Sequence, residues 1–366
     1  LRSLRLKDYL DHEGAPIELI NQDAAASVGW PLLLETGDLD MDEGLRSALY
    51  VAERNPDGVR LEFAVAGLHA VKEFRFDQQN HRIEVNASLT RDGQPEPFSL
   101  VWQGGFGDQS KGFDATYRAV VYREAGEFER EYISSVEAGQ DIASTTHIGL
   151  EDQYFLAMFL LEGGSLVRIE AEPCAAAEEA IQTVAIRIPS PRGTLQLYVG
   201  PKEQDSLRAV SADLVPVIDY GFFDILARPL LFGLLWIYSY VGNYGWSIIV
   251  LTLVINGILF PLRLKQQLSM LKMQKIQPQM KTLQDKYKKL KSSDPRRQEV
   301  QAEMMGLYKK HGVNPMGGCL PLLLQMPFLF AFFSLLRVAI EVRGEPWMLW
   351  IQDLSAPDPF YILPVL

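Results

Sequence analysis

The sequence predicts a multi-domain protein in which an all-β domain precedes an α-helical membrane domain. Residues 229–262 form a run of 34 residues without Asp, Glu, Lys or Arg, and residues 312–336 form a second uncharged run. A helix needs about 20 apolar residues to cross a bilayer, so two such runs indicate an integral membrane protein. Residues 1–215 have the composition of a water-soluble domain, and residues 216–366 form the membrane domain.

The first domain is predicted to be β-rich. Residues 82–90 alternate in polarity, with Ile83, Val85, Ala87 and Leu89 on the apolar face. A period of two is typical of a half-buried strand. Similar runs, separated by turn residues, recur near residues 60–65, 72–76, 98–103, 117–122, 165–171, 182–188 and 194–199. Many strands with few helical stretches favour an antiparallel sandwich.

The first uncharged run is too long for one span. As a single helix it would reach about 50 Å, against about 30 Å of hydrocarbon. The sequence Gly242-Asn-Tyr-Gly245 divides it. We therefore predict an interfacial helix over residues 222–241 and a span over residues 244–262. The second span is predicted over residues 317–336.

The loop between the spans, residues 263–311, is strongly basic. It carries thirteen Lys or Arg and four Asp or Glu, a net charge of +9, and since the whole chain carries −11, the remainder carries −20. Short basic loops stay in the cytoplasm, so the acidic first domain is expected across the membrane. Cys174 and Cys319 then lie on opposite sides of the membrane and are not expected to form a disulfide.

The ends of the sequence predict further segments. An external first domain requires a signal or an anchor, and no apolar leader precedes it here. Residues 360–366 resemble the start of another span. We expect that the chain is a fragment at both ends.

The basic loop is predicted to be a helical hairpin. An apolar seam with 3-4-3-4-3 spacing runs along its first helix: Met273, Ile276, Met280, Leu283, Tyr287 and Leu290. Pro278 is expected to kink this helix, and residues 292–295 to turn the chain. Packing of the two helices explains the seam, but methionine-rich faces also adapt to varied apolar ligands. The alternative is a partner contact face formed by Met273, Met280, Met304 and Met305.

Polar residues inside the spans are the other candidate site. Thr252 and Asn256 are four residues apart and share one helix face. Asn256 lies about 9 Å and Gln325 about 12 Å from the cytoplasmic ends of their spans. One reading is an interhelical hydrogen bond that holds the two spans together. The other is a water-accessible pocket in the inner leaflet, since polar groups in membranes tend to face protein or water.

Catalytic motifs are not evident in the sequence. Residues 107–112 lack the residue order of a phosphate-binding loop, and the GxSxG pattern does not occur. The five histidines show no spacing typical of metal ligands. We therefore predict a protein that is not an enzyme and needs no cofactor or metal.

Several motifs are specific: residues 313–321 running into Gln325-Met-Pro327, and residues 350–364, 219–221 and 241–247. Weaker matches are residues 198–202 and 153–155. These motifs resemble the YidC/Oxa/Alb membrane insertase family in its Gram-negative bacterial form. The resemblance covers nearly the whole chain and is strongest from about residue 217.

The resemblance implies a periplasmic β-supersandwich followed by the first part of a five-helix membrane core in the bacterial inner membrane. It implies that the protein inserts and helps fold inner-membrane proteins through a hydrophilic groove, without nucleotide or cofactor. The implied partners are nascent inner-membrane proteins, the Sec translocon, the ribosome and the phospholipid bilayer, with no nucleic acid recognised by sequence. Groove residues would be Thr252, Asn256 and Gln325.

One position departs from the family pattern. Where the family's groove carries an arginine, the matching residue here is Asn256. Arg263, about 10 Å nearer the cytoplasm, is interpreted as an ordinary membrane anchor or, alternatively, as a substitute groove charge. The alternative function is a membrane-tethered periplasmic carbohydrate-binding or mutarotase-like protein, because supersandwich domains also occur in sugar mutarotases.

Overall fold

The chain divides into two compact units. We call Leu1–Asp219 with Val338–Gly344 the β unit, and Tyr220–Arg337 with Glu345–Leu366 the helical unit. The computed structural model of the protein describes residues 1–11, 14–77, 79–110, 115–136, 139–174, 181–189, 193–287, 296–310, 320–356, 358 and 360.

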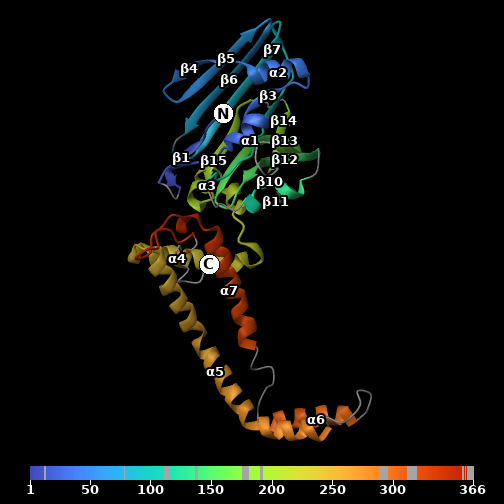
Figure 1. Ribbon diagram of the computed structural model, residues 1–366, viewed down its shortest axis with the longest axis vertical. Helices are drawn as coiled ribbons and strands as arrows, with labels where there is room; N and C mark the ends of the chain where they lie inside the picture. Colours follow the sequence, from blue (N-terminus) through green and yellow to red (C-terminus); the bar gives the residue numbers. More distant parts are fainter. Residues whose placement is uncertain are drawn as a thin grey trace. The chain divides into compact units, whose positions relative to one another are not determined.

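The β unit is built from antiparallel strands (Figure 1). One large sheet has the strand order β11-β10-β12-β13-β15-β7-β6-β5-β4, with β14, β9, β3 and β8 attached beside this path, and β1 and β2 form a separate pair. The strands are β1 (Arg5–Leu10), β2 (Pro16–Glu18), β3 (Leu33–Glu35), β4 (Val51–Asn55), β5 (Gly58–Val65), β6 (Leu68–Asp77), β7 (Arg82–Arg91), β8 (Gln94–Pro95), β9 (Ser99–Trp102), β10 (Ala119–Glu124), β11 (Glu127–Tyr132), β12 (Gln140–Glu151), β13 (Phe155–Cys174), β14 (Ile181–Pro189) and β15 (Leu195–Pro201).

Strand β13 joins the two layers of this curled sandwich. Its first part, Phe155–Leu160, pairs with β15, whereas its last part, Arg168–Cys174, pairs with β14. Gly163 and Gly164 lie between these parts with φ values of 72° and 71°. Glycine adopts positive φ without steric cost, and irregularities of this kind bend a strand. The glycine pair therefore lets one strand take part in both layers.

Aromatic packing forms the centre of the β unit. Trp102 is 1% exposed, and its ring lies 5.9 Å from that of Phe159 and 6.0 Å from that of Phe106. Both contacts are edge-to-face, the arrangement favoured by the ring quadrupoles. The alternation predicted for residues 82–90 is confirmed, because Val85 and Leu89 belong to this core.

Three short helices of the β unit were not predicted: α1 (Gln22–Val28), α2 (Leu39–Ser47) and α3 (Gln204–Val210). The Asn21 side chain accepts from Ala24 N and starts α1, and Asp38 accepts from Met41 N at the start of α2. Such caps satisfy free backbone donors and stabilise helices too short to show a clear hydrophobic period. The predicted β-rich sandwich followed by helices is confirmed.

Among its described residues the helical unit has four longer helices: α4 (Asp224–Val241), α5 (Tyr244–Tyr287), α6 (Arg296–Lys310) and α7 (Leu320–Val338). The predicted break in the uncharged run is confirmed. Gly242 adopts φ 68° and its N–H donates to Tyr238 O, which ends α4. This left-handed cap favours glycine. Figure 1 shows α4 lying across the start of α5.

Helix α5 differs from the sequence expectation because it runs without interruption past residue 262, where the first span was predicted to end. Pro261 and Pro278 both lie inside it. Each proline removes one backbone donor but leaves the neighbouring turns hydrogen-bonded. Figure 1 shows α5 changing direction, so that its last turns run beside α6.

Some sequence predictions lie outside the described residues. These are the hairpin turn at 292–295, the motif at 313–319 with Cys319, and the further span at 361–366. The predicted second span corresponds to α7 from Leu320 onward. Phe223, in the short η4 helix (Gly221–Phe223), stacks on Phe330 of α7 with 5.9 Å between ring centroids.

Candidate functional site

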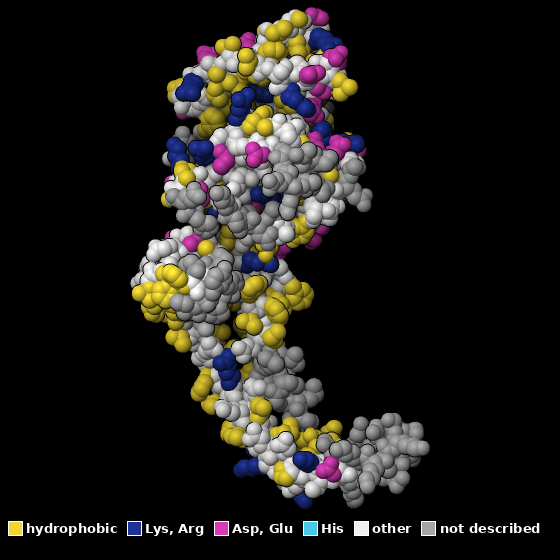
Figure 2. All heavy atoms as spheres, viewed as in Figure 1, with side chains coloured by type: hydrophobic (Ala, Val, Ile, Leu, Met, Phe, Trp, Pro, Cys, Tyr) yellow, Lys and Arg dark blue, Asp and Glu magenta, His cyan; other side chains and the backbone are white. Residues whose placement is uncertain are grey.

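The helical unit offers long apolar helices with few charges. Gly221–Val241 and Tyr244–Leu283 are each long and apolar enough to cross a membrane, and Gln325–Val338 is a shorter apolar helix among the described residues. In Figure 2, yellow hydrophobic side chains gather on the visible surface of this unit, whereas most visible Asp and Glu side chains lie on the β unit. The apolar surface of these helices is what a lipid environment would accommodate.

Thr252 and Asn256 share one face of α5, as their spacing predicts. The Asn256 Nδ2 donates to the carbonyl oxygen of Thr252 at 2.8 Å. Asn256 is partly exposed and Thr252 is exposed. The amide therefore satisfies one of its donors within its own helix and keeps its remaining polar atoms for other partners.

Gln325 of α7 is also partly exposed. Among the described residues, no hydrogen bond joins its side chain to Asn256. The interhelical bond that the sequence left open is thus not formed between these two amides in the structure. A polar surface on α5 and a separate polar residue on α7 remain.

The continuity of α5 places Arg263 on the same face as Asn256. The two residues are seven apart within one unbroken helix, which corresponds to two turns and about 10 Å. Thr252, Asn256 and Arg263 thus form a polar stripe along α5. Arg263 is partly exposed.

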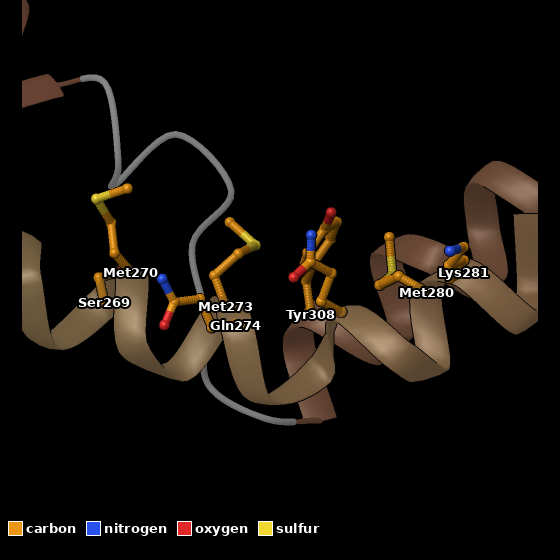
Figure 3. A pocket seen from close by; sticks show the side chains of 8 residues that line it. Ser269, Met270, Met273, Gln274, Met280, Lys281 and Tyr308 are labelled. Carbon is orange, nitrogen blue, oxygen red and sulfur yellow. The ribbon is translucent and has the colours of Figure 1, made fainter.

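A cavity of about 560 Å³ opens between α5 and α6. Figure 3 shows Met270, Met273 and Met280 rising from one side of α5. Tyr308 contributes from α6. The described residues that line the cavity are Ser269, Met270, Met273, Gln274, Gln277, Met280, Lys281 and Tyr308.

The four methionines of the predicted contact face divide in the structure, while the predicted seam is partly buried. Ile276 and Met280 are buried at 3% and 7% exposure, as the seam requires. Met273 and Met280 line the cavity, whereas Met305 is 51% exposed and is not among the described lining residues, nor is Met304. The 3-4 spacing could not separate these roles, because it shows which residues share a face and not which helix covers them.

A junction at the start of α5 was missed by sequence reasoning. Asn243 Nδ2 donates to Pro346 O at 2.9 Å, and Asn243 Oδ1 accepts from Trp246 N at 3.1 Å. A Cβ at Gly245 would lie 2.2 Å from Cδ1 of Trp347, so only glycine fits beside this ring. The Trp246 and Trp347 rings meet edge-to-face at 5.9 Å. The motif around Gly242–Ser247 therefore builds a close contact with the loop that follows residue 344.

That loop has its own polar support. Trp350 Nε1 donates to Asp358 Oδ1 at 3.1 Å, and Phe360 N donates to the same oxygen at 3.0 Å. Asp358 is 9% exposed. The carboxylate thus holds Trp350 and the chain at Phe360 together, which gives these three residues of the sequence motif a structural role.

Comparison with known proteins assigns both parts of the chain. A family model described as YidC periplasmic domain matches residues 1–232, and a model described as 60Kd inner membrane protein matches residues 236–366. The chain belongs to the YidC membrane protein insertase family. This confirms the resemblance and implies an inner-membrane location. This insertase family is not a family of enzymes.

Curated YidC relatives match to different extents. A membrane protein insertase YidC from Wolinella succinogenes is 52% identical over 169 residues, covering 46% of this chain and 30% of that protein. The YidC of Bordetella avium is 32% identical over 328 residues, covering 84% and 57%. The YidC of Cupriavidus necator is 31% identical over 390 residues, covering 99% and 68%. The chain thus spans less than two thirds of the length of the first two relatives.

Proposed function

We propose that the protein inserts and helps fold inner-membrane proteins. The observation that carries this proposal is the 52% identity over 169 residues to a protein named membrane protein insertase YidC. The two family models that together account for residues 1–232 and 236–366 support it. No nucleotide or cofactor is needed, because the apolar segment of a client partitions into lipid by its own hydrophobicity.

The polar stripe on α5 supports a mechanism for this activity. A charged side chain at the centre of a bilayer costs about 2.5–3.5 kcal/mol on insertion scales. We propose that Thr252 and Asn256, with Gln325 of α7, line a hydrated groove that shortens the dry path for polar flanks of a client. Arg263, on the same face, would give the cytoplasmic mouth of this groove its positive charge.

The charge distribution supports an orientation. The basic loop 263–311 would lie in the cytoplasm as a helical hairpin, and the acidic β unit in the periplasm. In this orientation α4 would lie in the outer interface, which fits its position across α5 in Figure 1. Nascent inner-membrane proteins, the ribosome and the Sec translocon are the partners we propose. The phospholipid bilayer would receive the client.

A hydrated groove predicts thiol reactivity at residue 256. In the full-length protein with Cys174 and Cys319 replaced by serine, Asn256→Cys is expected to react with a charged, membrane-impermeant thiol reagent added from the cytoplasm. The thiolate is the reactive form, and it forms in water rather than in hydrocarbon. The labelling rate in inverted membrane vesicles measures this access.

The matched control is Ile258→Cys. Ile258 is 71% exposed and lies two residues away on the opposite side of α5, where lipid would cover it. We expect labelling at 258 to be at least about tenfold slower, because a buried thiol ionises poorly. Equal protection of both positions would reject the hydrated groove.

The methionine-lined cavity predicts a role in receiving clients. Replacing Met270 and Met273 with glutamine is expected to lower photocrosslinking of apolar nascent segments severalfold, because each change removes adaptable apolar surface worth about 1 kcal/mol or more. Met305→Gln serves as the control, since Met305 is exposed outside the described cavity lining.

Deleting residues 273–305 should impair insertion without altering the membrane topology of the protein. Unimpaired insertion in a depletion strain would reject a role of this segment in receiving clients.

A further inference from the structure

A short segment that follows α7 belongs to the β unit. Residues Val338–Gly344 group with Leu1–Asp219, and not with α7 before them or with residues 345–366 after them. The chain therefore passes between the two units at three points, after Asp219, after Arg337 and after Gly344. A domain attached only by its own end would need a single passage.

Buried apolar side chains pack this segment against the core of the β unit. Ile340 is 4% exposed and is a member of the hydrophobic core that contains Trp102 and Phe155. Ala339 and Val342 are each 4% exposed. Full burial of one aliphatic side chain contributes about 1.5–3 kcal/mol, so the segment completes the core rather than resting on its surface.

Arg343 adds a charged contact. Its Nη2 donates to Asp108 Oδ2, and the side chains of Arg343 and Asp108 are only 10% and 0% exposed. The guanidinium carbon lies 5.1 Å from the ring centre of Tyr154 and 5.2 Å from that of Phe155. A desolvated guanidinium over aromatic faces gains cation–π attraction in addition to its ion pair.

The β unit presents Asp108 in a rigid setting. Its Oδ1 accepts from Ser110 N at 2.8 Å and from the Ser110 hydroxyl, and its own N–H donates to Asp152 Oδ2 at 2.6 Å. Arg118 Nη2 donates to its carbonyl oxygen at 2.9 Å. The carboxylate therefore cannot move toward solvent to recover hydration if Arg343 is removed. Removing one partner of such a buried pair leaves an uncompensated charge, which is strongly destabilising.

We infer that Val338–Gly344 is a docked segment that ties the chain after α7 to the β unit, with Arg343 on Asp108 as the contact that fixes it. Helix α7 before the docked segment and the loop after it are then joined to the β unit through a folded element and not through a free linker. The β unit thereby has a second point of attachment besides its own C-terminal end. This inference does not depend on the insertase activity.

Hydrogen exchange in the full-length protein tests the docked segment. The amides of Val342 and Arg343 donate to Ala339 O at 3.3 Å and Ile340 O at 3.0 Å, so they report whether the segment is folded. We expect Arg343→Gln to raise exchange at these amides on the order of a hundredfold, because a buried carboxylate loses its partner. Asp108→Asn should raise it similarly, and the double variant no further than either single one.

The matched control is Arg168→Gln, which breaks a pair with Asp141 at 3.5 Å whose side chains are 50% and 54% exposed. Exposed ion pairs contribute little to the free energy of unfolding, so hydrogen exchange at the amides of residues 342 and 343 should not change. Arg343→Lys keeps the charge but loses the planar stacking and should give an intermediate rate. Unprotected amides in the native chain, or unchanged exchange in both Arg343→Gln and Asp108→Asn, would overturn the inference.

Discussion

Replacing Asp152 with alanine is expected to lower the unfolding temperature of the β unit by roughly 6–12 °C, corresponding to about 3 kcal/mol or more. The Asp152 side chain accepts from the backbone N–H of Asp108 at 2.6 Å, of Tyr154 at 2.8 Å and of Phe155 at 2.7 Å. The residue is 1% exposed, so these three donors would lose their acceptor in the absence of solvent. Burial raises the pKa of the carboxyl group, and the donors partly oppose this.

Asp141→Ala is the control for this prediction. Asp141 lies in the same unit and has a partner only in the exposed pair with Arg168 among the ion pairs of the described residues. Its replacement should change the unfolding temperature by no more than about 1 °C. Calorimetry of the full-length protein in detergent measures both variants. Equal unfolding temperatures of the two variants would contradict a stabilising role for the three backbone hydrogen bonds that Asp152 accepts.

Gly245→Ala is expected to disrupt the junction between α5 and the loop after residue 344. The added methyl group would lie 2.2 Å from Trp347 Cδ1, so the ring must move. Trp347 also donates its N–H to Ile351 O at 3.1 Å, and Asn243 reaches its carbonyl oxygen at 3.4 Å. Overpacking of this kind typically costs about 1–3 kcal/mol. We expect faster hydrogen exchange at Trp347 and Ile351, and a reduction of the proposed insertion activity.

Gly257 provides the control in the same helix. A Cβ at Gly257 meets nothing within 4 Å, so Gly257→Ala should stabilise α5 by about 0.5–1 kcal/mol. The same chemical change is thus predicted to have opposite effects twelve residues apart. Trp347→Leu combined with Gly245→Ala should restore slow exchange at Ile351 by removing the clash. Equal behaviour of the two alanine variants would contradict the close contact.

The sequence predicted features that depend on local patterns. The alternation at residues 82–90 and the break at Gly242 both appear in the structure, because polarity period and a left-handed cap are properties of neighbouring residues. The continuity of α5 past Pro261 was not predicted, since proline lowers helix stability but does not fix where a helix ends.

Features that depend on distant residues could not be predicted in this way. Residues 338–344 look like an ordinary loop in sequence, and only the fold shows Ile340 in the core of the β unit. Gly245 beside Trp347 is a contact between segments a hundred residues apart. The depth of Asn256 and Gln325 was derived from helix rise alone, which does not indicate the direction of either side chain. Asn256 bonds within its own helix instead.

The bent strand β13 has a consequence for biogenesis. Val85 of β7 finds its neighbour in Leu195 of β15, and Trp102 of β9 in Ile186 of β14. During synthesis one edge of β7 and one edge of β9 therefore stay unpaired until β15 and β14 have been made. Pairings so distant along the polypeptide are slow to form, and unpaired edges invite aggregation in the meantime. Newly made chains are thus expected to depend on a chaperone that shields these edges before the sheet closes.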